Sequence, residues 1–214
     1  MFKNIKAAIF DLDGTLVDSM HVWEQIDNDF LKSKGLEVPY NLKEEITHLS
    51  FQQTAEYFKN RFKLNESPEE LMEIWHNMAY EHYCNDIKLK DGAYEFLSLL
   101  KSKNIKIGLA TSNSRPLLTA SLKLNNILEF FDSITTTDEV ENSKSCPDIY
   151  LLSAKRLGVK PEECIVFEDI LEAVKGAKLA NMKVVAVYDK AAQHQKDSLM
   201  RTADKYINKF YDLL

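Results

Sequence analysis

The chain has 214 residues, of which 45% are hydrophobic and 28% are charged, with six Gly and five Pro. These values are ordinary for a globular protein, and they exclude a fibrous or low-complexity chain and a disulfide-stapled mini-protein. The 27 Lys and Arg against 33 Asp and Glu give a formal net charge of −6, which repels nucleic-acid phosphates and anionic membrane surfaces. We therefore expect neither nucleic acid nor a membrane as a partner.

The cysteines and the N-terminal residues bear on cellular location. Cys84, Cys146 and Cys164 cannot all pair within one chain, and their spacing is not that of a zinc site. They are typical of reduced thiols in a cytosolic protein. The first residues lead into a short apolar run that ends at Phe10, which is too short for a signal peptide or a spanning helix. The expected location is the cytoplasm, and we expect a monomer.

Four short, continuously apolar runs predict strands that are covered on both faces, as in a parallel sheet. They are residues 7–10, 105–110, 165–167 and 184–188. Apolar residues at helical spacing separate the last three runs. This alternation of strand and helix predicts an α/β fold with a doubly wound, Rossmann-like parallel sheet.

A long insertion separates the first run from the second. About 94 residues lie between them, whereas one crossover connection needs a dozen or more. Apolar residues within the gap recur at spacings of three and four, and loop-forming residues interrupt them. We predict a small all-helical domain over residues 18–86 and an α/β core domain made of residues 1–17 and 87–214.

Polar residues follow three of the predicted strands. They are Asp11 and Asp13 after the first, Thr111, Ser112 and Asn113 after the second, and Glu168 and Asp169 after the third. Ligands bind beyond the carboxyl ends of the strands in open α/β sheets, so four acids could meet in one crevice. Two carboxylates about 4 Å apart repel by roughly 4 kcal/mol at an effective dielectric of 20, which a cation or a proton must relieve.

Each acidic pair also has a simpler interpretation. The Asp-Leu-Asp-Gly-Thr sequence alone could be a solvated turn, and Glu168 with Asp169 could cap the next helix. If the pairs do meet, their hard oxygen ligands suit Mg²⁺.

Four ordered motifs together resemble the haloacid dehalogenase superfamily of phosphotransferases. This resemblance favours a shared site over the two simpler interpretations. The motifs are residues 10–19, residues 109–113, Lys144 with residues 147–150, and residues 166–169. The Glu-Asp form of the fourth motif and the position of the insertion are similar to the β-phosphoglucomutase-like branch, whose α-helical cap domain follows the first motif. The resemblance covers essentially the whole chain.

The resemblance implies a role for each motif residue. Asp11 is similar to the nucleophile that forms an aspartyl-phosphate, and Asp13 to the general acid and base. The residues that correspond to phosphate-binding positions are Thr111, Ser112, Asn113 and Lys144. The Mg²⁺ ligands of the family correspond to Asp11, the backbone carbonyl of Asp13, Glu168 and Asp169.

The predicted cap departs from the mutase pattern. Mutase caps carry a Lys and an Arg that hold the second phosphate of a bisphosphate, whereas Thr47 and Phe51 stand at the corresponding positions here. Candidate cap residues for substrate specificity are Trp23, Thr47, His48 and Phe51. The alternative is that Trp23 and Phe51 simply fill the core of the cap.

The sequence therefore predicts a Mg²⁺-dependent phosphatase that hydrolyses a small phosphorylated metabolite, of sugar-phosphate type, through an aspartyl-phosphate. One alternative is a β-phosphoglucomutase-like phosphotransferase. Another is a catalytically idle binding or regulatory protein on the same fold. A dehalogenase is disfavoured because that reaction does not use the second Asp, which is present as Asp13.

Overall fold

The computed structural model describes residues 4–46 and 51–214. It divides the chain into two units. The α/β unit consists of Met1–Ser19 and Ile87–Leu214, and the helical unit is Met20–Asp86.

A six-stranded sheet forms the centre of the α/β unit, and every neighbouring pair of strands is parallel. The strand order is β3-β2-β1-β4-β5-β6. The strands are β1 Ala7–Phe10, β2 Lys106–Thr111, β3 Ser133–Thr136, β4 Cys164–Glu168, β5 Lys183–Val187 and β6 Lys205–Ile207. The chain moves outward from β1 to one edge and then returns to build the other half from β4. This reversal between β1 and β4 is the topological switch point of a doubly wound sheet, which confirms the predicted fold class.

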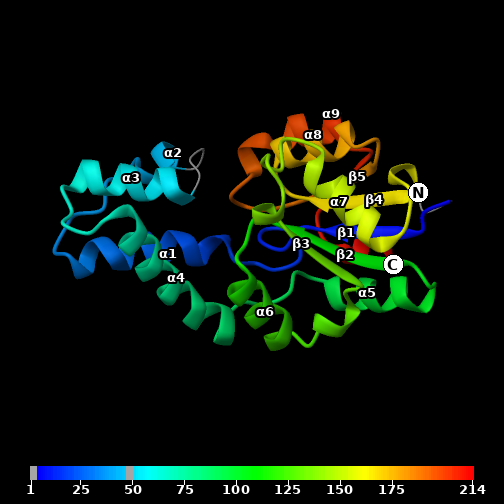
Figure 1. Cartoon of the computed structure of the whole chain (residues 1–214), viewed down its shortest axis with the longest axis horizontal. Helices are drawn as coiled ribbons and strands as arrows, with labels where there is room; N and C mark the ends of the chain where they lie inside the picture. The colour runs from blue at the N-terminus through cyan, green and yellow to red at the C-terminus, as the bar shows by residue number, and fades with distance from the viewer. Residues whose placement is uncertain (1–3, 47–50) are drawn as a thin grey trace. The chain divides into compact units, whose positions relative to one another are not determined.

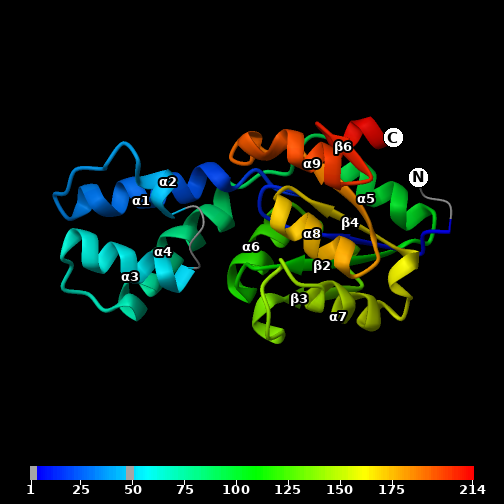
Figure 2. The same ribbon diagram turned by 90° about the horizontal axis from the view of Figure 1, so that it is seen from above.

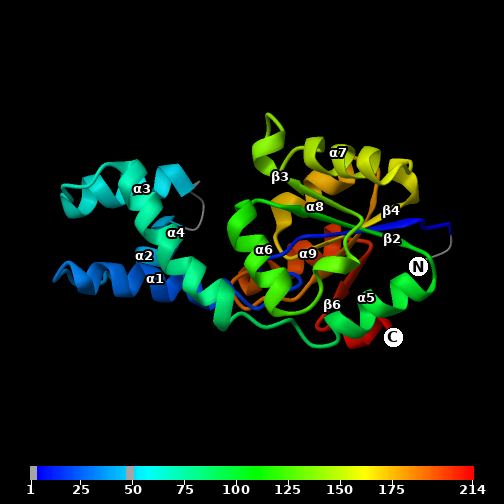
Figure 3. The same cartoon turned by 60° about the horizontal axis from the view of Figure 1, so that its bottom comes forward.

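Helices cover both faces of this sheet, as Figures 1 and 3 show. On one face lie α5 (Ala93–Ser102) and α6 (Arg115–Leu124), and on the other lie α7 (Asp148–Leu157) and α8 (Leu171–Leu179). The short helix α9 (Lys196–Thr202) packs beside α8. This arrangement explains the continuous apolar runs, because a strand that is covered on both sides has no solvent-facing position.

The pleat of β1 supplies one side chain to each half of the core. Phe10 stacks on Phe167 with ring centroids 4.5 Å apart and lies near the edge of Phe96 from α5. Its neighbour Ile9 belongs to the cluster on the opposite face, which includes Tyr150 of α7. Both halves hold β1 in place, so the residue that follows Phe10 is fixed at the middle of the sheet.

Strands β3 and β6 were not predicted from the sequence. Both are edge strands of four residues or fewer, Ser-Ile-Thr-Thr and Lys-Tyr-Ile, and each pairs with one neighbour. An edge strand is partly exposed and needs no continuous apolar run, so the pattern that revealed the central strands is missing from it.

The described part of the helical unit contains four helices (Figure 2). They are α1 Met20–Ser33, α2 Leu42–Ile46, α3 Phe51–Phe62 and α4 Pro68–Asn85. A capping box between Ser67 and Glu70 starts α4, where Pro68 suits the first turn. The buried ring of Trp75 packs against Phe58 and Phe30, with centroids 4.8 and 5.7 Å apart. Among the described residues, no helix is both long enough and apolar enough to cross a membrane.

Candidate active site

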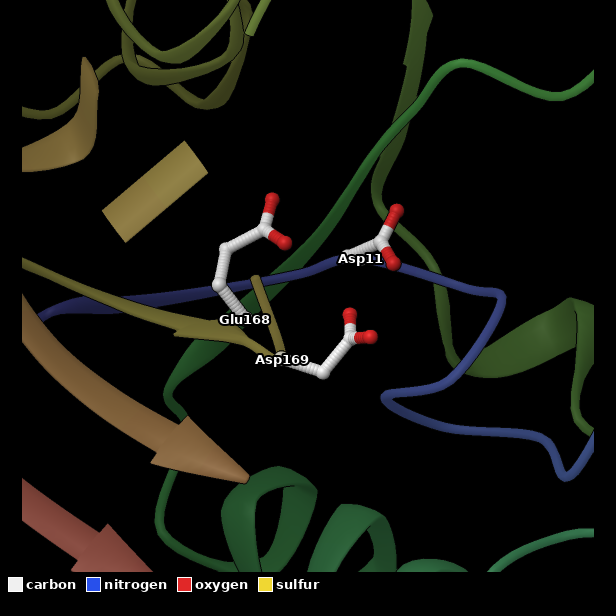
Figure 4. Close-up of side chains that lie close together, drawn as sticks. All are labelled: Asp11, Glu168 and Asp169. Atoms are coloured by element: carbon white, nitrogen blue, oxygen red, sulfur yellow. The ribbon is translucent and has the colours of Figure 1, made fainter. Parts of the chain in front are cut away.

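Three carboxylates meet at the switch point between β1 and β4. Asp11 directly follows β1, and its backbone N–H donates to the carbonyl of Phe167 at 3.0 Å. Glu168 ends β4, and Asp169 follows it. Each residue can offer one ligand oxygen such that all three oxygens lie within 4.8 Å of one another (Figure 4). The carboxyl ends of neighbouring parallel strands thus bring together residues that are about 157 positions apart in the chain.

Lys144 joins this cluster as a buried cation. Its Nζ lies 2.6 Å from Asp11 Oδ1 and 2.5 Å from Glu168 Oε1. Burial by itself lowers the pKa of Lys144, but the charges of Asp11 and Glu168 outweigh it and raise the pKa above its ordinary value. Lys144 therefore stays protonated and neutralises one of the three carboxylates.

The remaining negative charge is poorly compensated. Burial raises the pKa of Glu168 to about 7, with Lys144 lowering it and Asp11 raising it. Burial also raises the pKa of Asp169 well above its usual range, and the charges of Asp11 and Glu168 add to this effect. The raised pKa values mean that the protein alone does not supply enough positive charge to keep both Glu168 and Asp169 ionised.

The donor set fits a hard divalent cation. The three carboxylates offer oxygen ligands only, which is the preference of Mg²⁺ and Ca²⁺. In addition, Glu168 Oε2 is buried and has no hydrogen-bond partner among the described residues. Buried polar atoms are almost always paired, so this orphaned oxygen indicates a missing positive partner. The cluster can therefore hold a metal ion.

Asp13 lies close by in a different environment. Its Oδ1 accepts a hydrogen bond from Ser19 Oγ at 2.6 Å, and its Oδ2 accepts one from Asn113 Nδ2 at 2.7 Å. The backbone N–H of Asn113 in turn donates to Thr111 Oγ1 at 3.0 Å. Thr111 and Asn113 are buried, whereas Ser112 is exposed. The polar residues after β1 and β2 are thus linked by hydrogen bonds.

The turn after Asp13 packs against the acidic cluster and is hydrogen-bonded to it. Gly14 has φ +81°, a left-handed conformation that favours glycine, and a Cβ there would overlap the carboxylate of Asp169. The hydroxyl of Thr15 donates to Asp169 Oδ1 at 3.0 Å. The glycine is required both for the turn and for the close approach of Asp169.

Comparison with known proteins agrees with this geometry. Residues 8–187 match the family of haloacid dehalogenase-like hydrolases. The chain belongs to this family. It is therefore a hydrolase of the haloacid dehalogenase superfamily, and several of its relatives are named as phosphatases.

Two such relatives match most of the hydrolase. The phosphorylated carbohydrates phosphatase of Thermotoga maritima is 30% identical over 179 residues, which are 84% of this chain and 83% of that protein. Hexitol phosphatase B of Escherichia coli K12 is 27% identical over 213 residues, which are 99% of this chain and 95% of that protein. The crystal structure of β-phosphoglucomutase from Clostridium difficile is similar with a TM-score of 0.78 at 25% identity, covering 98% of this chain and 93% of that one.

Two residues of the hydrolase that touch the cluster or its turn were not singled out from the sequence. Tyr150 of α7 donates from its hydroxyl to Glu168 Oε1 at 2.8 Å, and burial, with the charge of Glu168, raises its pKa. Lys90 donates to the carbonyl of Gly14. Tyr150 lies inside the third motif, which could have drawn attention to it. Lys90 lies 76 residues from Gly14 in a loop, and no sequence pattern marks it.

The cap residues predicted to set specificity are only partly described. Trp23 is half-buried, and 43% of Phe51 is exposed. Their rings lie 5.9 Å apart, Phe51 is also 5.9 Å from Trp75, and Trp23 is 6.4 Å from Tyr83. Both therefore take part in the aromatic packing of the helical unit, and contact with substrate stays a prediction. Thr47 and His48 lie outside the described residues.

Proposed function

We propose that this hydrolase is a Mg²⁺-dependent phosphatase of a small phosphorylated metabolite of the sugar-phosphate type, acting through an aspartyl-phosphate on Asp11. The observation that carries the proposal is the buried group of Asp11, Lys144, Glu168 and Asp169 with too little positive charge. The names of the two curated relatives support the substrate class, because they refer to phosphorylated carbohydrates and a hexitol.

In this proposal, Asp11 is the nucleophile. Lys144 holds Oδ1 of Asp11 at 2.6 Å and so fixes the orientation of the carboxylate. A carboxylate oxygen of Asp11 forms a bond to phosphorus while the bond from phosphorus to the ester oxygen breaks. Mg²⁺ bound by Asp11, Glu168, Asp169 and the Asp13 carbonyl would neutralise charge on the incoming phosphate. Four carboxylates, one phosphate dianion and Lys144 sum to −5, and Mg²⁺ reduces this to −3.

Asp13 carries the proton in both half-reactions. When protonated, it donates to the leaving oxygen of the metabolite. The resulting carboxylate then takes a proton from the water that attacks the aspartyl-phosphate. Ser19 and Asn113 orient the carboxyl group, and a hydroxyl such as Ser19 Oγ can accept as well as donate, so it accommodates both protonation states.

The phosphoryl group needs donors as well as a metal. Thr111 and Lys144 are proposed to hold it, with Ser112 and Asn113 as further donors from the segment that leads into α6. In the structure the side chain of Asn113 bonds to Asp13 and its backbone N–H bonds to Thr111 Oγ1, so the exposed Ser112 is the more accessible contributor.

The test is phosphate release from a panel of hexose, pentose and hexitol phosphates, with and without Mg²⁺, alongside the Asp11→Asn variant. We expect Mg²⁺-dependent release by the wild-type enzyme only. Release that is equal without a divalent cation, or equal in Asp11→Asn, would overturn the mechanism. Conversion of β-glucose 1-phosphate to glucose 6-phosphate faster than phosphate release would instead favour the mutase alternative.

A further inference from the structure

Lys90 lies in the segment that joins α4 to α5, and its ammonium group reaches three acceptors. It donates to the carbonyl of Gly14, to the carbonyl of Tyr188 at 2.7 Å and to Asp189 Oδ2 at 2.8 Å. A lysine ammonium has three N–H donors, so all of them are used. The side chain of Lys90 is 13% exposed, and that of Asp189 is 4% exposed.

The ion pair between Lys90 and Asp189 is complete without Gly14. Asp189 Oδ1 also accepts a hydrogen bond from the backbone N–H of Ala191 at 2.8 Å, so both carboxylate oxygens are satisfied. A buried ion pair contributes little net stability compared with an apolar pair of similar volume. The contact with the Gly14 carbonyl is therefore not explained by pairing of the two charges.

Lys90 holds the turn after β1 at two points. Besides the side-chain contact with Gly14, the backbone N–H of Lys90 donates to the carbonyl of Leu16 at 2.8 Å. Asp169 also lies against Gly14, where a Cβ would overlap it. Gly14 thus contacts both Asp169 and Lys90, and its chain neighbours are Asp13 and Thr15.

We propose that Lys90 is a positioning residue: by holding the Gly14 carbonyl, it sets the place of Asp13 and Thr15 beside the acidic cluster. The inference rests on the proposed function in so far as Asp13 is the proton carrier. It extends that function by assigning a role in it to a residue outside the four motifs. Lys90 itself touches neither substrate nor metal in this proposal.

The experiment compares Lys90→Met with the double variant Lys90→Met/Asp189→Asn. The single variant leaves Asp189 buried without its cation, whereas the double variant leaves no unpaired charge. Lys190→Met is the matched control, because it removes the exposed lysine next to Asp189. For each protein we would measure kcat, KM, the melting temperature and amide hydrogen exchange of residues 11–17.

We expect both Lys90 variants to lower kcat by roughly 10- to 100-fold with a much smaller change in KM, because small displacements of a catalytic group cost that much. Amide exchange of residues 11–17 should accelerate in both. The double variant should regain melting temperature without regaining kcat, and the control should match wild type. If Lys90→Met alone does not fold, the kcat and the amide exchange of the double variant test the proposal.

Recovery of wild-type kcat and exchange in the double variant would overturn the proposal, because Lys90 would then serve only to pair with Asp189. An unchanged exchange rate for residues 11–17 in both variants would overturn it regardless of activity. If the wild-type protein releases no phosphate, the proposed function fails, and the exchange measurement still decides whether Lys90 orders the turn.

Discussion

Asp11 is the side chain whose chemistry depends most directly on its position in the sheet. It follows a strand that is buried on both faces, and one of its oxygens is held by Lys144. An amide at this position keeps the shape and can still accept the hydrogen bond from Lys144, but it cannot attack phosphorus.

We therefore expect Asp11→Asn to lower turnover by more than about 10³-fold while the protein stays folded. Phosphate release and the melting temperature, measured on the same purified sample, check this. Lys144 still has Glu168 as its second carboxylate partner in the variant, which is why the fold should survive. Turnover at the wild-type rate would exclude Asp11 as the nucleophile.

Asp13 differs from the three buried acids, because hydrogen bonds from Ser19 and Asn113 satisfy it without a metal. Asp13→Asn can keep both contacts, since its carbonyl oxygen can accept from Asn113 and its amide can donate to Ser19. We expect kcat for a sugar phosphate to fall by roughly 10²- to 10⁴-fold, the usual contribution of general acid-base catalysis.

The dependence on the leaving group makes this prediction specific. An aryl phosphate has a leaving oxygen that needs little protonation, so the Asp13→Asn variant should lose less activity toward it than toward a sugar phosphate. Parallel kinetics on the two substrates measure the difference. A loss below tenfold on the sugar phosphate would mean that another group carries the proton.

At the scale of elements, helix α8 determines where Lys144 lies. Gly176 of α8 packs closely on the loop that contains Lys144 and Cys146, called the Lys144 loop. A Cβ at Gly176 would overlap the carbonyl oxygen of Lys144 and lie 2.9 Å from the carbonyl oxygen of Cys146. This glycine has an ordinary helical conformation, so it is needed for close approach and not for a turn.

We predict that Gly176→Ala destabilises the protein by about 1–3 kcal/mol, as overpacking of a buried contact does, although alanine favours helix. The displaced Lys144 loop should also lower kcat. Denaturant unfolding and steady-state kinetics measure the two effects. Lys175→Ala, an exposed change in the same helix, is the control and should alter neither. A Gly176→Ala variant as stable and active as wild type would show that the loop can move away without cost.

The elements that the sequence predicted are those whose surroundings leave a local pattern. Strands β1, β2, β4 and β5 are covered on both faces and therefore read as continuous apolar runs, whereas the edge strands β3 and β6 do not. The motif residues after β1, β2 and β4 were identified because they follow these strands directly, whereas Lys144 was identified from the family resemblance. Lys90 was not, because its role depends on acceptors 76 and 98 positions away that only the folded chain brings to it.

At the scale of the whole molecule, the burial of Glu168 and Asp169 links stability to pH and to metal. The pKa of Glu168 is about 7 in the folded state against 4.5 as its ordinary value, so the folded state binds more protons between these values. The free energy of unfolding of the metal-free protein therefore falls as pH rises through this window. Lys144 does not alter the pH dependence of stability in this window, because its raised pKa keeps it protonated until far higher pH.

A second group titrates in the same range. Burial, together with the charge of Glu24, raises the pKa of Asp27 in α1 to about 7. Its effect on stability has the same sign, so the pH dependence of the metal-free protein alone cannot be assigned to the acidic cluster. The change in stability that Mg²⁺ produces can be assigned to the acidic cluster. Asp27 is not part of the proposed metal site, so it contributes equally with and without the cation.

We predict that the rise in melting temperature on adding Mg²⁺ is small at pH 5 and large at pH 8. Below pH 7, protons compete with the cation for Glu168, and the raised pKa of Asp169 adds to this competition. Above pH 7, Glu168 is ionised and binds the cation, which relieves its repulsion with the neighbouring carboxylates. At 100 times its dissociation constant, a bound ligand stabilises the folded protein by about 2.7 kcal/mol, which is enough to measure.

Differential scanning fluorimetry from pH 5 to pH 8, with Mg²⁺ or with a chelator, tests this prediction. The Asp169→Asn variant should lose most of the Mg²⁺ effect at pH 8, and a rise of equal size at both pH values in the wild-type protein would contradict the assignment of the metal to this cluster.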